Sequence, residues 1–175
     1  MPIIQTVDPQ NAKGNVKEAY AVFEQMGADV PLPMQMHSAS PELMGVHHGI
    51  MKYFMTHKNL GFPVLTHIRL LTANEENYPY CTNLNAQWLQ MAGGLTPEQI
   101  EAAKQDPENA ALDDKDKALL KFVVQVVKDP ASTTAEDIQN LRDLGWTDAD
   151  VFDAVYHAMG MVGAGIMFKA FKMAE

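Results

Sequence analysis

Cysteine is nearly absent from this sequence: Cys81 is the single one in 175 residues. One thiol cannot form an intramolecular disulfide, so the fold depends on packing alone. Hydrophobic residues make up 47% of the chain, which is enough to bury a sizeable core. We therefore expect a chain that folds without disulfide staples.

Positive charge is also scarce. Lys and Arg number 13 against 22 Asp and Glu, which gives a formal net charge of −9. A chain of this charge is repelled by phosphate backbones and by anionic lipid. We therefore expect neither nucleic acid nor a membrane surface as a partner.

Long apolar runs are missing as well. The longest candidate, around residues 158–170, contains Gly160, Gly163, Gly165 and Lys169 and is shorter than the roughly 20 residues of a bilayer span. The first residues lack the basic region and apolar stretch of a secretory signal. These absences predict a cytoplasmic, soluble protein. We find no internal repeat and no glycine-rich phosphate loop.

Helix signals fill the chain, whereas alternating β-branched runs with hairpin turns do not occur. The pattern predicts an all-α fold with helices at 15–26, 40–57, 63–76, 79–93, 96–105, 113–129, 134–145 and 147–173. The Val30 to Pro33 segment is expected to be a loop because each proline disfavours helical geometry in the preceding residue. We expect one domain over 1–175, with an N-terminal helical extension (1–60), core helices (61–105) and C-terminal helices (113–175).

The thiol lies at the start of a predicted helix. Pro79 fits the first helical position, so Asn77 or Tyr78 is the expected cap and Cys81 falls in the first turn. Free N–H groups and the macrodipole favour a thiolate there. The alternative is that Cys81 is a small, inert, buried hydrophobic residue.

Several separated segments follow one another in a recognisable order: residues 14–20 (GNVKEAY), 40–43 (SPEL), 63–93 and 141–148 (LRDLGWTD). Together they resemble the AhpD-like superfamily of alkylhydroperoxidase D proteins and carboxymuconolactone decarboxylases, especially its peroxidase-related members. The resemblance implies a bundle of about seven to eight helices, a homo-oligomer and redox chemistry.

The family motif, an upstream Glu followed by C-x-x-C-x-x-x-H, is only partly present. Cys81 takes the place of the second cysteine, Tyr78 that of the first, Asn85 that of the histidine and Thr66 that of the glutamate. A cycle with one cysteine remains open: the Cys81 thiolate attacks a peroxide and an external thiol reduces the sulfenic acid. Asn85, one turn later, would hold the peroxide or the thiolate.

Other side chains extend this candidate site. His67, on the preceding helix, is a possible replacement base. Tyr78, Tyr80 and Trp88 are candidate pocket residues, although aromatic side chains at helical spacing also serve as core. The six histidines lack the spacing of a zinc pair, and the adjacent His47 and His48 point about 100 degrees apart, so no metal or other cofactor is expected.

Three functions stay open at this level. The first is a thiol-dependent peroxidase with Cys81 as nucleophile. The second is a carboxymuconolactone-decarboxylase-like protein that has lost thiol chemistry and binds or converts a small organic acid. The third is a helical homo-oligomer without catalysis, in which helices apolar on more than one side cover one another.

Overall fold

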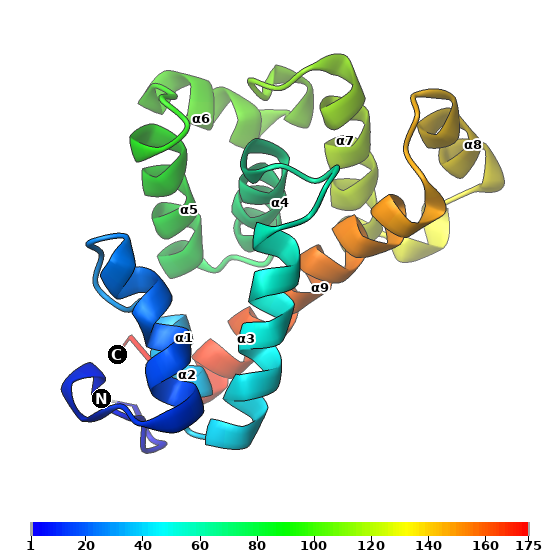
Figure 1. Cartoon of the computed structure of the whole chain (residues 1–175). Helices are drawn as coiled ribbons and strands as arrows, with labels where there is room; N and C mark the ends of the chain where they lie inside the picture. Colours follow the sequence, from blue (N-terminus) through cyan, green and yellow to red (C-terminus); the bar gives the residue numbers. More distant parts are fainter. Residues whose placement is uncertain (1, 175) are drawn as a thin grey trace. The chain divides into compact units, whose positions relative to one another are not determined.

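The computed structural model describes residues 2–174, and all regular secondary structure in that range is helical (Figure 1). This confirms the predicted all-α class. The described α-helices are α1 (Gly14–Gln25), α2 (Leu32–His37), α3 (Pro41–Met55), α4 (Phe62–Glu75), α5 (Pro79–Met91), α6 (Pro97–Gln105), α7 (Asp114–Lys128), α8 (Ala135–Asp143) and α9 (Asp148–Ala170). Short 3-10 turns lie at Pro9–Asn11, Pro107–Asn109 and Pro130–Ser132.

The predicted boundaries hold where the sequence carries a cap. Thr96 and Gln99 form the expected capping box of α6. Tyr78 is the N-cap of α5, with Pro79 at the first helical position. The prediction of a loop through Val30 to Pro33 is wrong in part, because α2 begins at Leu32 and includes Pro33 in its first turn, where the missing N–H has no intrahelical partner.

The first compact unit comprises the described residues of 1–57 and 166–175. Within it α1 and α2 both pack against α3. The buried side chains of α1 repeat at helical spacing, at Val16, Ala19, Tyr20 and Phe23, as the sequence predicted. The Tyr20 hydroxyl donates to the carbonyl of Val7 at 3.0 Å, which attaches the segment before α1 to the core of this unit.

The second unit comprises residues 58–165 and holds the candidate site. Its centre is α4, which lies between α5 and α7 and packs against both (Figure 1). Because neighbours surround α4, its buried residues run around the helix rather than along one stripe: Val64, Leu65, Thr66, His67, Ile68, Leu70, Leu71, Thr72 and Ala73. The expectation of a single domain over 1–175 stays a prediction.

Helix α9 is apolar on more than one side. Phe152, Tyr156 and Met159 are exposed, while Ala154 and Ala158 are buried. Among residues 2–174 this is the one helix long and apolar enough to cross a bilayer, with a mean hydropathy of 1.4. A core helix of a soluble protein meets the same criteria, so length and composition do not establish a span. Homo-oligomerisation through such a face remains a prediction.

Candidate functional site

Arg69 organises a polar cluster inside the second unit. From α4, its Nε donates to Asn85 Oδ1 on α5 at 2.8 Å, and its Nη2 donates to Thr66 Oγ1 one turn earlier at 2.8 Å. Its Nη1 lies 3.1 Å from His157 Nε2 on α9. Because arginine has no acceptor, Nε2 of His157 must accept this bond and the ring is neutral. The guanidinium therefore links three helices through uncharged groups.

The positive charge of Arg69 has no carboxylate partner among residues 2–174. None of the ion pairs in that range includes Arg69. Burial lowers the pKa of Arg69 to about 10, which still leaves the guanidinium charged at neutral pH. Burial, followed by the charge of Arg69, lowers the pKa of His157 to about 3. The cluster thus carries one net positive charge.

Cys81 lies beside this charge. The thiol is 3% exposed, and burial raises its pKa to about 11. The nearby Tyr78 hydroxyl and the charge of Arg69 both act to lower that pKa, in this order, but do not outweigh burial. The expectation that the first turn of α5 favours a thiolate is therefore not met, because desolvation of the sulfur is the larger effect.

Tyr78 is fixed by packing. Its side chain is buried and its ring lies against Gly165 of α9, where an added Cβ would meet Tyr78 Cδ1 at 3.1 Å. Burial raises the pKa of the Tyr78 phenol, and the nearby Cys81 raises it further. The hydroxyl therefore stays protonated at neutral pH and can act as a donor to the sulfur of Cys81.

Two glycines of α9 test this packing. Gly160→Ala is expected to raise the free energy of unfolding by roughly 0.5–1 kcal/mol, since glycine weakens a helix and a Cβ at Gly160 meets nothing within 4 Å. Gly165→Ala is expected to lack this gain, because its Cβ would press on Tyr78. Urea denaturation of both variants measures the difference. Equal stabilisation by the two substitutions would contradict a tight contact at Gly165.

The structure brings most of the residues predicted for the site together. Cys81, Asn85 and Trp88 lie on one face of α5; Asn85 bonds to Arg69, and the guanidinium carbon lies 5.4 Å from the centre of the Trp88 ring. The Asn85 amide also donates to the Cys81 carbonyl at 2.8 Å. Tyr80 is partly exposed in the first turn of α5 and contributes electrostatically to Tyr78.

His67 is placed differently from the rest. It is fully buried, and its Nδ1 lies 2.8 Å from the carbonyl of Pro63. Burial lowers its pKa, and the groups that lower the pKa of Cys81 are Tyr78 and Arg69 rather than His67. A base role for His67 stays a prediction.

Sequence reasoning missed Arg69 and the role of His157. The signal for Arg69 was present, because it is the single Lys, Arg, Asp or Glu between Phe62 and Ala73. A charge in such a stretch is costly to bury and is therefore informative. His157 carried no comparable signal, since its partner lies 88 residues earlier in the sequence.

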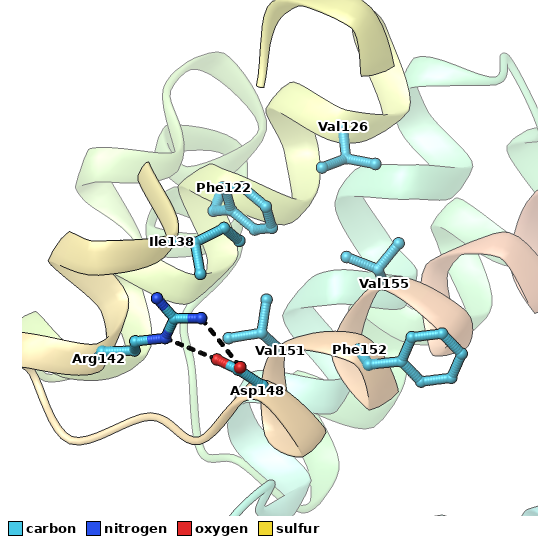
Figure 2. Close-up of a pocket in the computed structure, with 8 residues that line it drawn as sticks. All are labelled: Phe122, Val126, Ile138, Arg142, Asp148, Val151, Phe152 and Val155. Atoms are coloured by element: carbon cyan, nitrogen blue, oxygen red, sulfur yellow. Dashed lines mark hydrogen bonds and ion pairs between the residues drawn. The ribbon is translucent and has the colours of Figure 1, made fainter. Parts of the chain in front are cut away.

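A separate apolar hollow of about 350 Å³ lies between α7, α8 and the start of α9 (Figure 2). Its lining residues are Phe122, Val126, Ile138, Arg142, Asp148, Val151, Phe152 and Val155. Arg142 and Asp148 form an exposed, two-bond ion pair at 2.8 and 2.9 Å. The two charged side chains that line the hollow are therefore bound to each other. Residues 2–174 hold no group of three His, Cys, Asp or Glu side chains placed to bind a metal ion.

Comparison with solved structures decides the fold. The chain is similar to the alkylhydroperoxidase AhpD core of an uncharacterized peroxidase-related protein from Ralstonia eutropha JMP134, with a TM-score of 0.82. That match has 16% identity and covers 98% of this chain and 90% of the other. This chain has the AhpD-like fold. The prediction of that fold is confirmed.

A second solved structure is also similar to this chain. It is an uncharacterized peroxidase-related protein from Silicibacter sp. TM1040, with a TM-score of 0.76, 16% identity, and coverage of 99% of this chain and 94% of the other. No protein-family model and no curated protein matches the sequence. At 16% identity these similarities establish the fold and not the chemistry.

Proposed function

We propose that this protein is a thiol-dependent peroxidase that uses Cys81 as its one nucleophile. The observation that carries the proposal is the position of Cys81 one turn before Asn85, the residue that binds the charged Arg69 guanidinium. The nearby Tyr78 hydroxyl and the charge of Arg69 both lower the pKa of the thiol. Both groups favour the thiolate over the thiol. The AhpD-like fold and the peroxidase-related descriptions of both neighbours agree with this chemistry.

The atoms and electrons of the reaction balance among Cys81, the peroxide and an external thiol. The sulfur of Cys81 attacks one oxygen of a hydroperoxide and the O–O bond breaks, which gives a sulfenic acid and an alcohol. The thiol proton ends on the leaving oxygen. Two molecules of an external thiol then restore Cys81, releasing a disulfide and water. Asn85 and Thr66, held by Arg69, shape the polar side of the site.

The experiment is peroxide consumption in the presence of an external thiol, with a dimedone trap for the sulfenic acid. The wild type is expected to consume peroxide and to be labelled by dimedone at Cys81. Cys81→Ser is expected to show neither peroxide consumption nor labelling. Thr82→Ser, which changes the next buried residue in the chain, serves as the control and is expected to keep them. Peroxide consumption that persists unchanged in Cys81→Ser would exclude the proposal.

A second candidate is binding of a small organic acid without thiol chemistry. It is favoured by the raised pKa of Cys81, because a thiol with a pKa of about 11 stays protonated at neutral pH beside a charged guanidinium. The Cys81→Ser protein separates the two candidates. If Cys81→Ser behaves as the wild type does in the peroxide assay, and its melting temperature rises with an organic acid, the second candidate is correct.

A further inference from the structure

The two arginines of this chain differ in what balances their charge. Arg142 is exposed and holds the carboxylate of Asp148 through Nε and Nη2. Arg69 is partly exposed within a buried cluster and bonds to neutral acceptors. A charge taken out of water is costly unless an opposite charge compensates it. The site of Arg69 is therefore incomplete as a charge pair.

The hydrogen-bond inventory of Arg69 leaves donors available. Each terminal nitrogen of a guanidinium carries a pair of N–H groups, and Nη1 and Nη2 each make one bond, to His157 and to Thr66. One N–H on each terminal nitrogen therefore remains. Arginine commonly binds a carboxylate through a pair of N–H donors.

The surroundings select the class of anion. The cluster carries a single positive charge, which a monovalent anion neutralises, whereas a divalent oxyanion would leave excess negative charge in a buried site. The whole chain, at −9, further disfavours multivalent anions. The Trp88 ring, beside the guanidinium, offers an apolar surface to the organic part of a carboxylate.

We propose that Arg69 binds one small monovalent carboxylate, and that the bound carboxylate competes with the Cys81 thiolate for the same guanidinium and so suppresses the reactivity of the thiol. The carboxylate would be a regulator of the site described under the proposed function. The inference rests on that function in one respect, that Cys81 is the reacting group. The competition follows because one cation cannot fully compensate two anions.

The first test uses alkylation of Cys81 at pH 9, with glutathione as the free-thiol reference. The ratio of the rate with iodoacetate to the rate with iodoacetamide is expected to be about tenfold higher for the protein than for glutathione, because Arg69 binds the carboxylate of iodoacetate. Sodium benzoate is expected to slow alkylation by iodoacetamide, and sodium chloride at equal ionic strength is not. A ratio equal to that of glutathione, without protection by benzoate, would overturn the proposal.

The second test uses variants and thermal unfolding. Arg69→Met is expected to lose the preference for iodoacetate and the protection by benzoate, and Arg142→Met is expected to keep both. Saturating benzoate is expected to raise the melting temperature of the wild type by about 2 °C. This measurement on the wild type decides the matter even if Arg69→Met fails to fold, since no rise would contradict binding.

Failure of carboxylate binding at Arg69 and failure of the peroxidase proposal give different results. Benzoate binding that depends on Arg69, in a protein that does not consume peroxide, would leave this inference standing and remove the peroxidase. Peroxide consumption that depends on Cys81 but does not change with benzoate would remove this inference and leave the peroxidase standing.

Discussion

Replacing Asp150 by alanine is expected to lower the free energy of unfolding by about 3 kcal/mol. Asp150 is 3% exposed in the first turn of α9. Its carboxylate accepts from both the amide and the hydroxyl of Thr147, at 3.0 and 2.6 Å, and from the Asn59 side chain at 3.0 and 3.1 Å. Alanine would leave these donors without their acceptor at the end of the helix that carries His157.

Urea denaturation measures this loss, and Asp148→Ala is its matched control. Asp148 lies two residues earlier in the same turn, but it is exposed and paired with the exposed Arg142. Removing an exposed partner has a much smaller effect than removing a buried one. If Asp150→Ala proved as stable as Asp148→Ala, the network around Asp150 would not hold the start of α9.

Much of the fold is predictable because local chemistry specifies its boundaries. Thr96 with Gln99, and Tyr78 with Pro79, mark helix starts that depend on groups within a few residues. The short α2 escaped prediction because Pro31 and Pro33 argue against helix at its start, whereas in the structure the first turn tolerates Pro33. Packing against α3 then supports a helix of six residues that is too short to be stable alone.

The candidate site is less predictable than the fold because two opposing effects act on its thiol. The position of Cys81 in the first turn of α5 was visible in the sequence, and it favours the thiolate. Its degree of burial was not visible, and burial raises the pKa to about 11. Likewise, helical spacing placed Asn85 and Trp88 on one face with Cys81, but only tertiary structure supplies Arg69 and His157 from other helices.

Replacing Tyr78 by phenylalanine is expected to make Cys81 less reactive, because it removes the nearby hydroxyl that lowers the pKa of the thiol. Burial holds that pKa at about 11, so thiolate forms only as the pH rises toward that value. Without the hydroxyl the pKa rises further, and at pH 9 the thiolate fraction falls by about tenfold for each unit of the rise. The pKa of Tyr78 itself is raised, so its hydroxyl remains a donor in the wild type.

The rate of alkylation by iodoacetamide between pH 8 and 10.5 measures the effect. The whole curve for Tyr78→Phe is expected to lie at higher pH than that of the wild type, while Tyr156→Phe, which changes an exposed tyrosine of α9, keeps the wild-type curve. Phenylalanine retains the ring that packs against Gly165, so a shifted curve reports on the hydroxyl rather than on packing. A curve identical to the wild type would mean that burial and Arg69 alone set the reactivity of Cys81, and the site would then lack the donor on which the proposed thiol chemistry depends.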